Sequence, residues 1–498
     1  MTNTTEWITR SVSRLRSGAS STDKAPKASK PAADKPLADK QVADGAATKV
    51  PAPRSTHERL QATLRRGNES LSPRALRRLL ADLQDVVAPQ VSELEGGRRA
   101  QVVAGWYGQA EPEERRDMWL LLCEQFAPDA TRFQSARQRY EAAAGTADEG
   151  QAEISLRRAL VSPRTRLMQR FAVFPEGMRF LVDLRAELLP QLKSDKRLVA
   201  LDADLEHLFT TWFDVAFLEL RRLSWDSPAS LIEKLIKYEA VHDIRSWADL
   251  KNRLDSDRRC YGFFHPRLPN EPLIFVEVAL VDRISSSITP LLDEAAAPAD
   301  LKKATTAIFY SISNTQPGLR GVSFGDSLIK RVVEELKGEF PQLKVFATLS
   351  PIPGLRAWLG KNAEAVLQAM PRARQALARE LGQPELQASA LLKALDGVPE
   401  LGEKSALRRW LLGAAARYLG RDLDARGRPL DAVARFHLGN GARVERLNWL
   451  GDPSPKGLKQ SYGLMVNYLY DLKRLDKHRA LLAQGKVPVS GAMESLQD

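Results

Sequence analysis

The stretch AIFYSISNTQPGLRGVSFGDSLIKRVVEELKGEFPQLKVFATLSPIPG, which runs from Ala307 to Gly354, decides the fold of this chain. Its first residues, 307–312, are mostly β-branched and aromatic, which predicts a buried strand. Apolar residues then recur at helical spacing from Leu328 to Leu336, which predicts an amphipathic helix within 327–336. A second apolar strand, 344–349, and a Pro-Gly turn follow. This order predicts a domain built on a sheet.

The loop between the first strand and the helix reads RGVSFGD, residues 320–326. Backbone N–H groups at a helix N-terminus have no partner inside the helix, and the helix dipole adds positive partial charge there. Both effects favour a bound phosphate or pyrophosphate. The loop therefore predicts a phosphate-binding site, while an ordinary tight turn between strand and helix would have a similar composition.

The formal charge of +12 is concentrated at the N-terminus, because the first 57 residues hold ten Lys and Arg against five Asp and Glu. The difference between +12 and that +5 leaves +7 for the other residues. Their arginines stand beside glutamates on helical faces, as in EERR at 113–116, and no basic run alternates with aromatic residues. We therefore expect solvated helix faces and no nucleic-acid partner. A modest positive field also suits a phosphate-bearing ligand.

The two ends of the chain cannot contribute to a core. Residues 17–54 consist of Ala, Lys, Pro, Asp and Ser, so 1–56 is expected to be a low-complexity, disordered tail. No apolar run approaches the roughly 20 residues of a membrane helix, so no membrane partner is expected. Cytoplasm is the predicted location. The alternative is the mitochondrial matrix if residues 1–16, which are rich in Ser and Arg, act as a transit peptide.

Residues 57–202 carry helical signals almost throughout, which predicts an all-α domain. Ser72 and Ser162 each precede a proline, the pattern of a capping hydroxyl before the first helical residue. Two apolar stripes mark helix faces that would pack in a core: Leu76, Leu79, Leu80 and Leu83 form the first, and Met118, Leu121, Leu122 and Phe126 form the second.

Strand signals begin only after residue 202, so 203–487 is predicted to be an α+β domain with a mixed sheet, and 488–498 a C-terminal tail. A short helix is expected at 299–305 and a helical insertion at 362–426. For Tyr470, a half-buried position on the last helix is the alternative to a functional role. The candidate strands are 261–264, 273–281, 307–312, 344–349 and 442–449.

Histidine and serine offer the most direct chemistry. His437 stands in FHLGNG, which we expect to be a connection ending just before a strand, where catalytic groups are often mounted. His265 precedes a proline in a turn, so a turn-stabilising role competes with a chemical one. Ser350 opens the turn SPIPG at the end of a strand, and a Ser-Pro helix cap is its alternative reading. Cys123 and Cys260 lack metal-ligand spacing, so no metal site is expected.

Four strings closely resemble the malonyl-CoA decarboxylase family: HPRLPNEPLIFVEVAL at 265–280, FYSISNTQPGLRGVSFGDSLIKRVVEEL at 309–336, TLSPIPG at 348–354 and FHLGNGARVERLNW at 436–449. The resemblance implies a helical N-terminal domain that assembles a dimer or tetramer, followed by a catalytic domain with the GNAT acetyltransferase fold. It also implies conversion of malonyl-CoA to acetyl-CoA and carbon dioxide. No cofactor is expected, because the thioester carbonyl accepts the electrons released with carbon dioxide.

The same resemblance suggests roles for particular residues. His437 would donate a proton to the enolate carbon, and Ser350 would bind the malonyl carboxylate. Tyr470 would bond to this pair, and Ser311 is carried over as a further catalytic residue. The expected coenzyme A pyrophosphate loop consists of Arg320, Gly321, Val322, Ser323, Phe324, Gly325 and Asp326, assisted by Lys330 and Arg331. Some members of the family have an acidic residue in place of Ser323, so its expected role is that of a backbone N–H donor.

Two other functions remain open at this stage. The same loop and sheet would serve an acyl-CoA-dependent acyltransferase, which needs a second substrate and a groove for it. A helical interaction protein with a vestigial acyl-CoA domain would bind coenzyme A and be insensitive to changes at Ser350 and His437.

Overall fold

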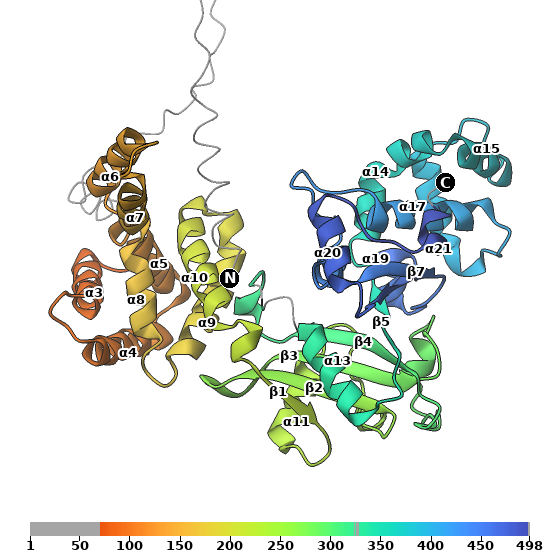
Figure 1. The fold of residues 1–498 in the computed structure, drawn as a ribbon, viewed down its shortest axis with the longest axis horizontal. Coiled ribbons are helices and arrows are strands. Elements are labelled where there is room, and N and C mark those ends of the chain that lie inside the picture. The colour runs from red at the N-terminus through yellow and green to blue at the C-terminus, as the bar shows by residue number, and fades with distance from the viewer. Residues whose placement is uncertain (1–69, 323, 325–327, 497–498) are drawn as a thin grey trace, which may run out of the picture. The chain divides into compact units, whose positions relative to one another are not determined.

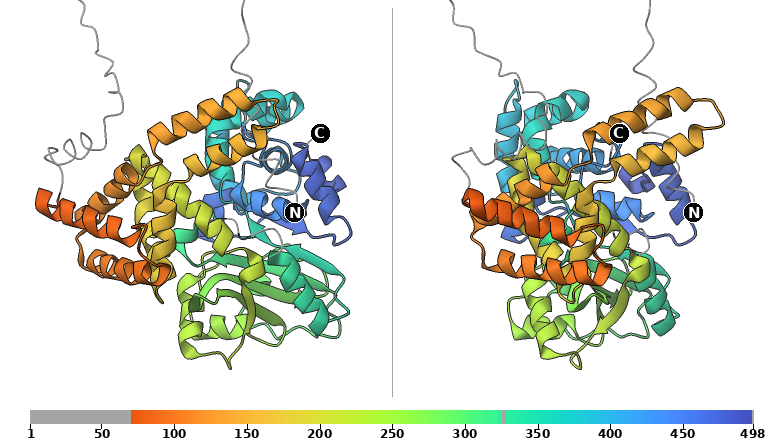
Figure 2. Two further views of the ribbon diagram at one scale, coloured as in Figure 1. Left: turned by 60° about the vertical axis from the view of Figure 1, so that its left-hand side comes forward. Right: turned by 90° about the vertical axis from the view of Figure 1, so that its left-hand side faces the viewer.

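The computed structural model describes residues 70–322, 324 and 328–496. Up to Trp212 this part of the chain is helical, as the orange to yellow ribbons of Figure 2 show. The α-helices are α3 (Pro73–Val86), α4 (Glu93–Gln109), α5 (Pro112–Gln125), α6 (Ala130–Ala143), α7 (Glu149–Leu160), α8 (Pro163–Phe171), α9 (Gly177–Leu188) and α10 (Val199–Trp212), with short 3₁₀ turns η1 (Leu189–Lys193) and η2 (Lys196–Leu198) before α10.

The predicted caps and faces of this helical segment are confirmed. Ser72 caps α3 by accepting the N–H of Ala75, and Ser162 caps α8 by accepting the N–H of Arg164. Both apolar stripes are buried in one continuous core. Each cap satisfies a backbone donor that the helix itself leaves unpaired, and typically contributes about 1 kcal/mol.

An eight-stranded mixed sheet follows, with the strand order β1-β2-β3-β4-β5-β8-β6 and with β7 also paired to β8. Every pairing is antiparallel except that of β4 with β5, which is parallel. The strands β1 to β4 lie side by side in Figure 1. The strands are β1 (Glu219–Leu223), β2 (Arg258–His265), β3 (Leu268–Val281), β4 (Thr306–Asn314), β5 (Val345–Thr348), β6 (Ser350–Pro351), β7 (Arg443–Asn448) and β8 (Met465–Leu469).

A bulge in β4 changes which face its residues occupy. Val278 of β3 pairs with Phe309, but the preceding residue, Glu277, pairs with Ser311, so Tyr310 is the extra residue. Side chains alternate between faces along a regular strand, and one inserted residue reverses the alternation beyond it. Phe309 therefore faces the main core, whereas Tyr310 and Ser311 face the opposite side of the sheet.

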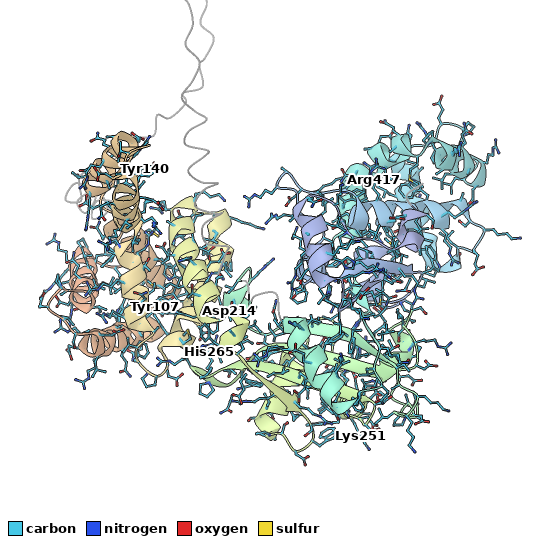
Figure 3. All side chains as sticks on the ribbon, in the orientation of Figure 1. Tyr107, Tyr140, Asp214, Lys251, His265 and Arg417 are labelled. Atoms are coloured by element: carbon cyan, nitrogen blue, oxygen red, sulfur yellow. The ribbon has the colours of Figure 1, made fainter. Side chains whose placement is uncertain are left out.

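Helices cover both faces of the sheet. The helix α13 (Leu328–Glu339) buries Leu328, Val332 and Leu336 in the main core. Two helices, α11 (Ala229–Tyr238) and α12 (Trp247–Arg253), pack on the opposite face, together with Cys260 and Phe275 of the sheet. The junction between α10 and β2 is marked by His265, whose ring lies 5.1 Å from that of Phe213 (Figure 3).

The rest of the chain is mostly helical and surrounds β7 and β8. Its helices are α14 (Leu355–Ala369), α15 (Pro371–Glu380), α16 (Ala388–Ala394), α17 (Ala406–Gly420), α18 (Ala432–Gly439), α19 (Pro455–Ser461), α20 (Leu475–Ala483) and α21 (Gly491–Glu494). Short 3₁₀ turns complete the fold: η3 (Val215–Phe217), η4 (Thr289–Leu291), η5 (Pro317–Leu319) and η6 (Leu395–Glu400). The helical insertion expected at 362–426 is confirmed by α14 to α17.

All five predicted strands exist, as does the predicted helix after the loop. Three local predictions are wrong. The segment 299–305 forms a turn instead of a helix, in which the carboxylate of Asp300 accepts the N–H of Lys302, a local bond that competes with helix formation. His437 lies in the last turn of α18 instead of a connection. Tyr470 directly follows strand β8 instead of lying on a helix.

Among the described residues, the chain has no helix with the length and apolar character needed to span a membrane.

Candidate active site

Two short strand segments bring the site's hydroxyl groups to one face. The strands β5 and β6 are separated only by Leu349, and Thr348 and Ser350 are two residues apart, so both side chains point to the same side. Ser350 donates its hydroxyl hydrogen to Thr348 Oγ1 across 2.8 Å. Thr348 is fully buried and Ser350 is 5% exposed. The alternative reading of Ser350 as a helix cap is wrong, because α14 begins at Leu355 after Gly354.

Strand β8 lies beside both of these segments and supplies Tyr468, and Tyr470 follows directly after it. Ala347 pairs with Leu469, and Ser350 pairs with Val466. The backbone N–H of Tyr470 donates to Phe346 O at 2.9 Å. Because Tyr468 and Tyr470 are two residues apart in extended chain, they share the face on which Ser350 lies.

His437 reaches this face from α18. Asp431 caps that helix by accepting the N–H groups of Val433 and Ala434, and it is only 2% exposed. The ring of His437 stacks on that of Tyr468, with 4.7 Å between centroids and 26° between planes. These contacts fix where the imidazole lies and which way its ring faces.

Both ring nitrogens of His437 have hydroxyl partners. Nε2 lies 3.3 Å from Ser350 Oγ, and Nδ1 lies 2.7 Å from the Tyr470 hydroxyl oxygen. Burial lowers the pKa of His437 to about 3 and raises the pKa of Tyr470 far above its ordinary value. Both groups are therefore neutral near pH 7. A neutral imidazole between two hydroxyl groups can receive a proton at one nitrogen and release one at the other.

Ser311 lies in a different environment. It faces α11 and α12, and its hydroxyl lies 2.8 Å from each carboxylate oxygen of Glu239. Ser313 donates to the same carboxylate at 3.0 Å. The hydrogen bonds of Ser311 therefore connect it to Glu239 and Ser313, on the face of β4 opposite to Phe309.

The predicted phosphate loop is described in part. Gly321 has a φ of +84°, a conformation that favours glycine, and a Cβ there would meet open space. Arg185 of α9 is 1% exposed and donates from Nη1 to the carbonyls of Gly318 and Arg320, at 2.8 and 2.9 Å. The helical segment therefore holds the first part of this loop. Ser323, Gly325 and Asp326 lie outside the described residues.

The remaining loop residues and the helix after them have distinct contacts. Phe324 accepts the N–H of Val215 at 3.0 Å, and both Phe324 and Val322 are 8% exposed. Lys330 is exposed on α13. Arg331 donates from Nη1 to the carbonyls of Val215 and Leu218. Of the two cations expected to neutralise phosphate, Lys330 is thus the more available.

Sequence reasoning missed two residues of this site, Thr348 and Tyr468. Each stands two positions before a residue that was singled out, Ser350 and Tyr470 respectively. The period of two along a strand was the signal that would have identified them. For Tyr468 this signal was hidden, because the segment around it was taken for helix.

Comparison with known proteins reveals close relatives over most of the chain. The family model "Malonyl-CoA decarboxylase N-terminal domain" matches residues 126–213, and "Malonyl-CoA decarboxylase C-terminal domain" matches 216–497. The mitochondrial malonyl-CoA decarboxylase of Mus musculus is 38% identical over 397 residues, covering 76% of this chain and 80% of that protein. Its counterpart from Anser anser anser is 39% identical over 342 residues, covering 64% and 66%.

Solved bacterial structures are similar over nearly their whole length. The malonyl-CoA decarboxylase of Rhodopseudomonas palustris has a TM-score of 0.72 and 41% identity, covering 84% of this chain and 99% of that one. The malonyl-CoA decarboxylase of Cupriavidus metallidurans has a TM-score of 0.70 and 42% identity, covering 85% and 100%.

Proposed function

The chain belongs to the malonyl-CoA decarboxylase family, and from that premise we propose that it converts malonyl-CoA to acetyl-CoA and carbon dioxide with Ser350 and His437 at the reacting atoms. The predicted fold, a helical N-terminal region followed by a GNAT acetyltransferase-like region with a mixed sheet, is confirmed by this membership. The enzyme is a carboxy-lyase of acyl-CoA metabolism, in which malonyl-CoA serves fatty-acid synthesis.

The reaction makes two demands on the site. Loss of carbon dioxide leaves an enolate, whose oxygen needs hydrogen-bond donors, and its carbon then needs a proton. One well-aimed donor typically contributes about 2.7 to 4 kcal/mol to a transition state of this kind. A positioned proton donor contributes about 10²-fold to 10⁴-fold in rate.

The observation that carries the proposal is the buried chain Ser350, His437 and Tyr470, with contacts of 3.3 and 2.7 Å. Ser350 would bind the malonyl carboxylate, and His437 would deliver a proton from Nε2 to the enolate carbon. Tyr470 would in turn give its hydroxyl hydrogen to Nδ1 of His437. Burial keeps water away from the carbanion, so that the proton comes from a positioned group.

The substrate's coenzyme A part would bind along the loop 320–326. The open space at Gly321 and the exposed Lys330 on α13 support a phosphate there. In this proposal Ser311 holds Glu239 in place on the other face of the sheet, because its hydroxyl is already committed to that carboxylate.

The test is release of labelled carbon dioxide from carboxyl-labelled malonyl-CoA, with no amine acceptor and with a chelator. We expect release by the wild type and its loss in Ser350→Ala and His437→Ala. His207→Ala is the matched control, since His207 is exposed on α10. Binding of coenzyme A without release would instead favour the acyltransferase, and unchanged activity in both variants would overturn the assignment of the pair.

The helical segment is proposed to assemble a homo-oligomer. Two apolar side chains on α4 face solvent, Leu94 at 62% and Val102 at 75% exposure. A second copy that covers them would bury this apolar surface. Light scattering should give a dimer or larger for the wild type and a smaller mass for Val102→Glu, whereas an unchanged mass would remove this helix from the interface.

The cellular location is a further prediction. We propose the cytoplasm, with the mitochondrial matrix as the alternative, which the mitochondrial relatives from mouse and goose support. The residues on which the alternative depends, 1–16, lie outside the described part. Fractionation of cells that produce the full chain, with and without residues 1–16, would separate the two locations.

A further inference from the structure

Thr348 lies directly behind the proposed catalytic pair. Its side chain is fully buried at the end of β5, and its Oγ1 lies 2.8 Å from Ser350 Oγ. The same oxygen accepts the backbone N–H of Tyr468 at 3.1 Å. The carbonyl of Thr348 accepts from Asn467 Nδ2 at 2.7 Å, so the residue is fixed on both its backbone and its side chain.

The hydrogen bond between Thr348 and Ser350 has a direction. Its geometry has Ser350 as the donor and Thr348 Oγ1 as the acceptor. A hydroxyl has one hydrogen to give and two lone pairs with which to accept. The two lone pairs of Thr348 are used by Ser350 and by the amide of Tyr468, and the one hydrogen of Ser350 points at Thr348 and away from His437.

This direction decides the tautomer of His437. Ser350 Oγ presents only lone pairs toward Nε2, which lies 3.3 Å away, so a hydrogen bond there needs the hydrogen on Nε2. In a neutral imidazole the other nitrogen is then an acceptor. Nδ1 accordingly accepts from the Tyr470 hydroxyl at 2.7 Å. All three donors point the same way, from Tyr470 through His437 and Ser350 to Thr348.

We propose that Thr348 is a positioning residue, which holds the Ser350 hydrogen in the substrate-free site and thereby keeps the proton of neutral His437 on Nε2, the nitrogen that faces the reacting carbon. When the malonyl carboxylate binds, the Ser350 hydrogen turns to that carboxylate, and Ser350 still presents only lone pairs to Nε2. This inference deepens the proposed function, on which its catalytic meaning rests. In the opposite tautomer Nε2 carries no hydrogen, so it would have no proton to give to the enolate.

The proton transfer then balances without a charged imidazole. The Nε2–H bond breaks as the enolate electron pair forms the new C–H bond, and Nδ1 takes the hydrogen of Tyr470. The negative charge passes from the enolate to the phenolate. After acetyl-CoA leaves, water gives a proton to Nε2 and Nδ1 returns its hydrogen to the phenolate, which restores the starting tautomer and releases hydroxide. Burial disfavours the phenolate, as the raised pKa of Tyr470 indicates, but an enolate carbon is a stronger base than a phenolate.

The test is ¹⁵N NMR of the full chain with labelled histidine, because a ring nitrogen that carries hydrogen and one that does not have well-separated signals. The His437 signals are assigned by their loss in His437→Gln. We expect the wild type to carry hydrogen on Nε2. A wild type with hydrogen on Nδ1 would overturn the proposal without any variant.

Three substitutions sharpen the test. Thr348→Val keeps the shape and removes the acceptor, so Ser350 becomes free to donate to Nε2 and the hydrogen should move to Nδ1. Thr348→Ser keeps the hydroxyl and should keep the wild-type signals. Thr306→Val is the matched control, because Thr306 is a buried strand threonine on β4. Unchanged His437 signals in folded Thr348→Val would overturn the proposal.

Kinetics separate a positioning role from a structural one. We expect Thr348→Val to lose about 10-fold to 100-fold in kcat, the range typical for residues that orient a functional side chain, with little change in KM. Thr348→Ser should restore most of this loss. A loss confined to KM would overturn the role in proton delivery. If the wild type released no carbon dioxide, the function would fail while the tautomer measurement would still decide the role of Thr348.

Discussion

Two serines of the same sheet, Ser350 and Ser311, were both expected to take part in the chemistry, and the structure gives them opposite surroundings. Ser350 belongs to a chain of neutral groups, in which each hydroxyl or ring nitrogen has a partner that can exchange roles with it. Ser311 donates to a carboxylate, Glu239, which cannot donate in return while it is ionised. A neutral chain can redirect its protons, whereas a carboxylate acceptor holds a hydroxyl in one orientation.

The ionisable groups around the two serines also differ. Near Ser311, the fully buried Glu277 accepts from Arg253 at 3.0 Å, and burial together with the neighbouring Glu239 raises the pKa of Glu277 to about 8. Near Ser350, burial lowers the pKa of His437 to about 3. Burial disfavours the charged form in both regions, so the carboxyl and the imidazole are both neutral near pH 7. The regions differ in the buried ion pair between Arg253 and Asp249, which among these contacts lies only on the side of Ser311.

The largest expected effect is on activity and separates the two serines. Ser350→Ala should lose about 10²-fold in kcat, because it removes a donor aimed at the reacting group. Ser311→Ala should keep its kcat and instead lose about 2 kcal/mol of unfolding free energy, because Glu239 loses one charge-assisted hydrogen bond. Steady-state kinetics and urea denaturation of both variants measure this. If Ser311→Ala lost as much kcat as Ser350→Ala, both serines would belong to one active site.

The next effect concerns His437 and stability. Its folded pKa of about 3 lies below the ordinary value near 6.5, so the unfolded chain binds the proton first as the pH falls. Stability should therefore drop as the pH falls below about 6.5, by about 2 kcal/mol by pH 5. Urea denaturation at neutral pH and at pH 5 should show this loss of unfolding free energy in the wild type and a smaller loss in His437→Gln. An equal loss in both would contradict the neutral buried imidazole.

A smaller effect of opposite sign is expected at Glu277. Its folded pKa of about 8 lies above the ordinary value, so the folded state binds the proton more tightly. This contribution to stability is present at low pH and is lost as the pH rises, and the loss is about 1 kcal/mol between pH 6 and pH 7. Glu277→Gln should remove this dependence. If the variant kept the dependence, the proton would belong to another carboxyl of the cluster.

The smallest effect is expected from the tail. Deletion of residues 1–55 should leave kcat and KM unchanged, because the composition of that segment offers nothing to a core or a site. The same labelled carbon dioxide assay measures it on the shortened chain. A large loss of activity would contradict the view of this segment as an appendage.

Much of the fold followed from local patterns. The strand before the phosphate loop and the helix after it were predicted within a few residues, because each buries one face and therefore shows a clear apolar period. Strand β8 was missed although MVNYL is a β-rich sequence, because Tyr470 just beyond it was considered for the last helix. The short α18 was missed as well, and the signal that could have found it is Asp431, a capping residue six positions before His437.

The amino-acid sequence by itself determined the family and the helical and mixed regions, since these depend on local periods and on matched strings. It also predicted the pair Ser350 and His437 from those strings. Only the tertiary structure decided which partners meet. Ser350 and His437 come together across 87 positions, while Ser311 is directed to Glu239 by the extra residue in β4. One inserted residue reverses the faces of a strand, and it arises from how β3 and β4 pair, which no local period records.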